Sequence, residues 1–157
     1  MADAETCELS ASHPPKPAAT KSFTALLPEI KHQLIHLRHD HDKHEPEYFQ
    51  DVAALSDVDL TAFDSDDIVA VRAGKVAYGV LIFGKVRLGK SNGGYIFVRW
   101  FVGGDDLDGD GVVEASEGEV EYKFHSFYTE DRHDAKPGER KYRAIMGEAD
   151  ELFFFSE

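Results

Sequence analysis

From residue 68 onward, apolar positions alternate with polar ones, and this two-residue period is typical of β-strands. Turn residues, mostly glycine, proline and asparagine, separate the alternating runs. Short turns join antiparallel neighbours, so we expect a meander of about six strands. The predicted strands cover residues 68–72, 75–88, 95–102, 119–129, 140–146 and 151–155.

Two adjacent strands of this meander are apolar on both faces. In residues 75–88, Val80, Ile82, Val86 and Leu88 share one face, while Leu81 and Phe83 share the other with Lys85 and Arg87. The turn before this strand is predicted at Ala73-Gly74. Because both faces must be buried, we predict a mainly β, α+β domain whose strands form a small barrel or a strongly curved sheet.

One amphipathic helix is predicted before the strands, over residues 23–44. Pro28 sits near its start, where the N–H that proline lacks costs nothing. At 100° per residue its apolar side chains form one stripe, which would cover the sheet. That stripe contains Phe23, Leu26, Leu27, Ile30, Leu34 and Leu37.

Histidines occupy the opposite side of this helix. The stretch from His32 to His44 holds five of them, and His32 and His36 are close enough, at i and i+4, to share one transition-metal ion. No third ligand stands at a defined spacing, whereas a structural zinc site needs a closed shell of ligands. We therefore favour a solvated polar face over a metal site.

The remaining composition bounds the class of protein. Residues 1–21 contain little to bury and are predicted to be a disordered tail, which leaves 22–157 as a single β-rich domain. The formal net charge of −13 opposes binding to nucleic acid and to anionic membranes. One cysteine, no signal sequence and no long apolar run together lead us to expect a cytoplasmic protein.

The most informative stretch is Asp106-Leu-Asp-Gly-Asp-Gly-Val-Val-Glu-Ala-Ser-Glu117. It fits the pattern D-x-[DN]-x-[DN]-G-x₅-E and so resembles the calcium-binding loop of EF-hand proteins. The resemblance implies that Ca²⁺ is the cofactor, that Gly111 makes the sharp turn, and that Glu117 binds through both carboxylate oxygens. The implied ligands are Asp106, Asp108, Asp110, Val112 through its carbonyl, Glu114 and Glu117.

The resemblance covers the loop only. An EF-hand flanks its loop with helices, whereas residues 95–102 and 119–129 favour strands through their β-branched and aromatic content. We therefore expect an EF-hand-like loop on a β-hairpin, without the helix opening of calcium sensors. The alternative is an acidic solvated turn.

A second motif, Gly84-Lys-Val-Arg-Leu-Gly-Lys-Ser91, matches the pattern of a phosphate-binding loop. We reject nucleotide binding, because such a loop needs a helix after it and a strand is predicted there. His125, Glu121, Tyr128 and Arg99 could line a barrel, but they form no recognisable catalytic set, so enzymatic activity stays open.

Two function classes follow. The first is a calcium-binding β-rich module in which the ion orders residues 106–117, with a protein as a further partner. The second is a small barrel that binds an apolar molecule, as a carrier or as an isomerase or cyclase.

Overall fold

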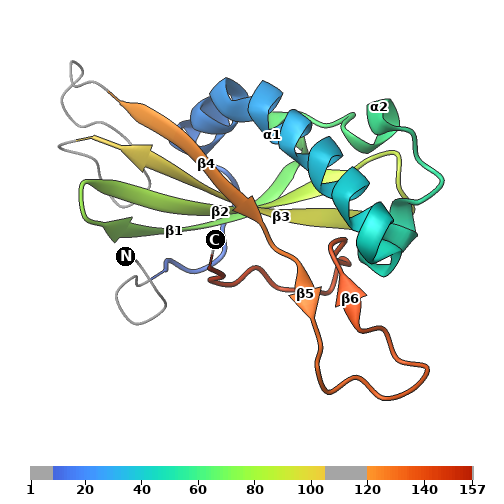
Figure 1. Ribbon diagram of the computed structural model, residues 1–157. Coiled ribbons are helices and arrows are strands. Elements are labelled where there is room, and N and C mark those ends of the chain that lie inside the picture. The colour runs from blue at the N-terminus through green and yellow to red at the C-terminus, as the bar shows by residue number, and fades with distance from the viewer. Residues whose placement is uncertain (1–8, 105–119, 157) are drawn as a thin grey trace.

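Four antiparallel strands form the central sheet of the computed structural model, which describes residues 9–104 and 120–156. In spatial order they are β1 (Ile68–Val76), β2 (Gly79–Leu88), β3 (Gly94–Gly103) and β4 (Glu121–Phe127). The helix α1 (Pro17–His44) crosses one face of the sheet, and the C-terminal segment runs along the other face (Figure 1). The coarse prediction, an α+β fold with an antiparallel meander and one N-terminal helix, is confirmed.

Short elements complete the fold. The connection from α1 to β1 contains η1 (Pro46–Val52), α2 (Asp57–Leu60) and η2 (Ser65–Asp67). After β4, the strands β5 (Glu130–Asp131) and β6 (Tyr142–Arg143) form a separate two-stranded ribbon (Figure 1).

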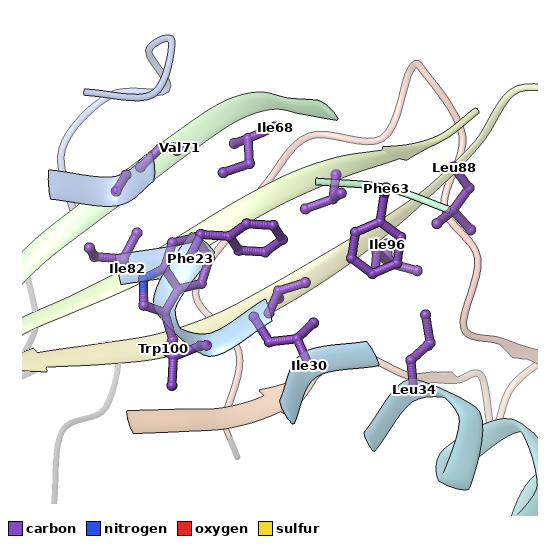
Figure 2. Close-up of a cluster of buried hydrophobic side chains, with 14 of the residues drawn as sticks. Phe23, Ile30, Leu34, Phe63, Ile68, Val71, Ile82, Leu88, Ile96 and Trp100 are labelled. Carbon is purple, nitrogen blue, oxygen red and sulfur yellow. The ribbon is translucent and has the colours of Figure 1, made fainter. Parts of the chain in front are cut away.

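The apolar stripe of α1 packs on the sheet as predicted. Phe23, Ile30 and Leu34 are buried against side chains of β1, β2, β3 and the connection (Figure 2). Partly buried side chains of β4 pack against the same cluster. At the centre, Trp100 of β3 packs against Phe23 with the ring centroids 5.4 Å apart. Its Nε1 donates a hydrogen bond of 2.8 Å to Ser22 Oγ, so a fully buried indole N–H has an acceptor.

The helix begins earlier than predicted. It starts at Pro17, six residues before Phe23, so Pro28 lies inside it rather than at its first turn. Pro28 is exposed, where water can bond the carbonyl that proline leaves unpaired. The preceding chain lies along β1, with Ser10 N donating to Ala73 O at 2.8 Å and His13 N donating to Val71 O at 3.0 Å. Within the predicted tail, residues 9–21 are therefore part of the fold; residues 1–8 lie outside the described residues.

Of the two predicted forms, a small barrel or a curved sheet, the barrel is not supported: among the described residues the sheet is open, with β1 and β4 as its two edges. The two faces of β2 were predicted correctly. Val80, Ile82, Val86 and Leu88 face α1. On the opposite face, Leu81 and Phe83 are covered by the C-terminal segment through Leu152 and Phe155. Two covering layers, rather than closure, bury both sides of the sheet.

Two further strand predictions need correction. The β1–β2 turn is Ala77-Tyr78 rather than Ala73-Gly74, because Gly74 pairs with Leu81 inside the ladder. Residues 151–155 form no strand. Three cationic side chains of the sheet bind carbonyls of the C-terminal segment instead: Lys85 binds those of residues 148 and 150, Arg72 that of residue 152, and Arg99 that of residue 155.

Candidate metal site at the β3–β4 hairpin

The strands predicted to flank the acidic loop are present and paired. Gly103 at the end of β3 is the Cα partner of Glu121 at the start of β4, and Val102 is the partner of Tyr122. The six predicted ligands, Asp106, Asp108, Asp110, Val112, Glu114 and Glu117, all lie in residues 105–119, outside the described residues. The structure therefore describes the base of the hairpin and not the ligand geometry.

The base of this hairpin is paired with the neighbouring strand β2 as well. Gly79, the first residue of β2, pairs with Gly103, which in turn pairs with Glu121. The turn between β1 and β2 adds a further contact, since Gly104 N donates a hydrogen bond of 2.9 Å to Tyr78 O. Tyr78 reaches this position with a φ of 63°, in the left-handed region that most side chains avoid. The residue that precedes the acidic stretch is thus held by an adjacent turn.

The ring of Phe101 occupies the space beside two glycines at this base. A Cβ at Gly103 would lie 2.5 Å from Phe101 Cε2, and a Cβ at Gly79 would lie 2.7 Å from Phe101 Cζ and 2.3 Å from Val102 O. The ring therefore covers both glycines and replaces the side chains they lack. The sequence analysis did not predict this arrangement. The spacing of Phe101 and Gly103, two residues apart on one strand and so on the same face, could have indicated it.

The catalytic candidates do not form one site. Arg99 Nε donates to His125 Nδ1 at 3.0 Å, and Arg99 Nη1 donates to Phe155 O at 2.7 Å. The imidazole ring of His125 is stacked on Phe101 with the centroids 6.1 Å apart. Glu121 is exposed. Tyr128 packs against Phe153, and burial raises the pKa of its hydroxyl.

The histidine face of α1 is exposed at His32, His36 and His39, as predicted. His39 Nε2 lies 2.8 Å from Asp57 Oδ2, and this hydrogen bond, together with one from Arg38, lowers the pKa of the Asp57 carboxyl. Among residues 9–104 and 120–156, no group of three or more His, Cys, Asp or Glu side chains could hold a metal ion. The histidine pair therefore has no further ligand in that part of the chain.

The motif at Gly84–Ser91 lacks the context of a phosphate-binding loop. Its first half lies inside β2, and β3 begins at Gly94, so a strand follows it where a helix N-terminus would be needed. The strand that was predicted after this motif, in place of a helix, is confirmed.

Comparisons of the chain with protein-family models, with curated proteins and with solved structures yield no match. No helix in the described part of the chain is long and apolar enough to cross a membrane. The functional argument therefore depends on the residues themselves.

Proposed function

We propose that this protein binds one Ca²⁺ ion through residues 106–117 and that the ion orders the β3–β4 hairpin. The observation that supports this proposal best is the pairing of Gly103 with Glu121. A calcium loop of this type is closed by its first and twelfth residues, so its two ends must lie close together. Asp106 follows Gly103 by three residues, and Glu117 precedes Glu121 by four. The paired strands would hold both ends of the motif near each other before the ion binds.

The pairing also lowers the entropic cost of forming the site. An unattached segment must lose loop-closure entropy when its ends come together. Here folding itself brings the ends together, through the ladder between β3 and β4 and the hydrogen bond from Gly104 N to Tyr78 O. The loop-closure entropy is therefore lost before the ion binds. The sheet therefore takes the role that two helices have in an EF-hand.

Charge makes the proposed loop depend on a cation. Five carboxylates, those of Asp106, Asp108, Asp110, Glu114 and Glu117, are ligands of one proposed ion. Without a cation they repel one another, and a protein of net charge −13 supplies little compensation. Because calcium would bind the folded hairpin preferentially, it should stabilise the protein by about 2.7 kcal/mol at 100 times its Kd.

A melting experiment tests the proposal. For a chain of this size, that stabilisation corresponds to a rise in Tm of roughly 5–10 °C between excess EGTA and saturating calcium. Glu117→Gln should remove most of the rise, because a bidentate ligand is lost, whereas Glu114→Gln should remove less, because position 9 often binds through water. Glu29→Gln, on the exposed face of α1, serves as the charge-matched control. An unchanged Tm in wild-type protein would refute calcium binding.

The alternative function, a carrier or an isomerase or cyclase for an apolar molecule, relied on the interior of a barrel. The described sheet is open and has no such interior. A groove of about 230 Å³ between α1 and β4 has Leu37, Phe124 and Phe127 in its lining, but also His36 and Asp40. This mixed lining does not favour an apolar ligand, so the calcium proposal has the better support.

A further inference from the structure

A separate cavity lies on the face of the sheet opposite α1. It has a volume of about 410 Å³, within the range of about 300–1,000 Å³ of small-molecule sites. Its walls come from residues 11 and 12, from β1 and β2, and from the C-terminal segment between residues 148 and 152. Chain segments far apart in the sequence thus enclose a space that belongs neither to the calcium hairpin nor to the apolar core.

Two cationic side chains line this cavity. Lys85 is 7% exposed, and its Nζ donates to Glu148 O and Asp150 O, each at 2.7 Å. An ammonium group has three N–H donors, so these two carbonyls leave one. The Lys85 Nζ also lies over the ring of Tyr95, 4.7 Å from its centroid. Burial lowers the pKa of Lys85, and the nearby carboxylates of Asp150 and Glu148 offset this effect only in part.

Arg72 has more donors available than Lys85. Its Nε donates to Ser10 O at 2.8 Å and its Nη1 donates to Leu152 O at 3.1 Å. The guanidinium carries five N–H donors, and no described residue accepts from Nη2. An arginine edge beside a lysine ammonium is an arrangement that binds a carboxylate.

Acidic side chains surround the same cavity farther out. The carboxylate of Asp150 is occupied by Arg143 Nη1 at 2.8 Å and by Gly147 N at 2.6 Å. Glu148 and Glu151 are exposed, line the cavity and make no ion pair among the described residues. Among the charged side chains that line the cavity, Lys85 is buried and Arg72 is half-buried, whereas Glu148 and Glu151 are exposed and form its rim.

This charge pattern selects against ions of a single sign. A simple anion would be repelled by the two rim glutamates, and a simple cation would be repelled by Arg72 and Lys85. We propose that the cavity binds a small zwitterion of amino-acid type, with its carboxylate on Arg72 and Lys85 and its ammonium group between Glu148 and Glu151. Such a ligand matches both parts of the cavity at once.

Three probes that share one carbon skeleton test the proposal. They are leucine, 4-methylpentanoate, which lacks the amine, and 3-methylbutylamine, which lacks the carboxylate. Binding is measured by saturation-transfer NMR and by calorimetric titration on the full chain in EGTA, so that the proposed calcium site does not contribute. Leucine should bind, and each analogue should bind at least about tenfold more weakly, because each loses one charge-assisted interaction.

Further variants test whether leucine binds in this cavity. They leave Arg72 and Lys85 unchanged, because these side chains also hold the C-terminal segment. Ala70→Phe should fill the cavity and abolish leucine binding, since Ala70 is part of its wall. Glu151→Gln should weaken leucine and strengthen 4-methylpentanoate, whereas Glu29→Gln on the far side of the molecule should change neither. Melting curves confirm that each variant is folded.

Any of three results would overturn the proposal. One is the absence of leucine binding to wild-type protein at about 10 mM, a concentration that reveals millimolar affinity. Another is equal affinity of the wild-type protein for leucine and 4-methylpentanoate. The third is equal affinity for leucine in wild type and a folded Ala70→Phe variant. A failure here leaves the calcium proposal intact, because the two sites share no residue.

Discussion

The substitution Gly79→Ala tests the base of the β3–β4 hairpin, which carries the proposed calcium loop. A Cβ at this position would lie 2.3 Å from the backbone oxygen of Val102, and Cβ atoms essentially never approach another atom closer than 3.0 Å. Because the obstructing atom belongs to the backbone of β3, the end of one strand must move. We expect this overpacking to cost about 1–3 kcal/mol.

Gly89→Ala is the matched control. The same methyl group at Gly89 would have no heavy atom within 4 Å, and this residue follows β2 directly. Replacing glycine by alanine also restricts the unfolded chain and stabilises a tolerant site by about 0.4–1 kcal/mol. The control should therefore be as stable as wild type or slightly more stable, so any loss in Gly79→Ala reflects the contact with Val102.

The assay is urea unfolding in EGTA, followed by the fluorescence of Trp100, which is the single tryptophan of the chain. The Gly79→Ala midpoint should fall below those of wild type and Gly89→Ala, with an unchanged slope. In calcium, the stabilisation should also be smaller for Gly79→Ala, because the displaced strand carries the first end of the loop. Equal midpoints for the two alanine variants would refute the described packing of the hairpin base.

Three other predictions concern the remainder of the fold. Ser22→Ala leaves the buried Trp100 N–H without its acceptor and should cost about 1–3 kcal/mol in urea unfolding; a wild-type midpoint would show that the bond does not matter. Phe155→Ala, at a side chain 5% exposed, should cost about 3–5 kcal/mol. Phe153→Ala, at 40% exposure, should cost clearly less, and equal losses would contradict the described C-terminal layer. For Asp150, burial alone would raise the carboxyl pKa, but the Gly147 N–H and Arg143 outweigh it and lower that pKa. A lowered pKa stabilises the fold above the ordinary value of 3.8 and loses this effect as the pH falls through the folded value. Asp150→Asn should therefore melt below wild type near neutral pH, with the gap closing below about pH 4; a gap that does not depend on pH would exclude this cause.

The sequence pattern correctly predicted which side chains of the strands and of the helix face the core. The alternation in residues 79–88 assigned each side chain of β2 to its face, and the 3.6-residue period identified the buried stripe of α1. The β3–β4 hairpin followed from two apolar runs on either side of the acidic stretch. In each case the signal is a repeat within one element, and such a repeat is readable over a window of roughly 4–18 residues.

The errors arose where distant residues decide the structure. Strands that are apolar on both faces indicate that a layer packs on each side of the sheet, but they do not identify the segment that forms the second layer. That layer is the C-terminal segment, held by bonds from Arg72 and Lys85 to carbonyls more than 60 residues away. Because these donors are side chains, no strand periodicity reports them. The cavity between them was missed for the same reason.

The turn and the helix start show a different limitation. Glycine at position 74 suggested a turn, yet Tyr78 takes the left-handed conformation, which tyrosine adopts rarely. Two prolines could each begin the helix, and Pro17 does so while Pro28 lies within it. The conformational preferences of single residues are small energies that tertiary packing can override. Here the hydrogen bond from Gly104 N to Tyr78 O favours the turn at residue 78, and the burial of Ala19 favours the earlier helix start.

Calorimetric titration of the wild-type chain with Ca²⁺, repeated with Mg²⁺ and on Asp106→Ala, is the most direct measurement of the central claim. The account predicts one calcium ion per chain with a Kd below about 1 mM, weaker binding of magnesium, and loss of the calcium heat in Asp106→Ala. Wild-type protein that takes up no calcium in this range, or Asp106→Ala protein that binds it as tightly as wild type, would contradict the assignment of residues 106–117 as the metal site.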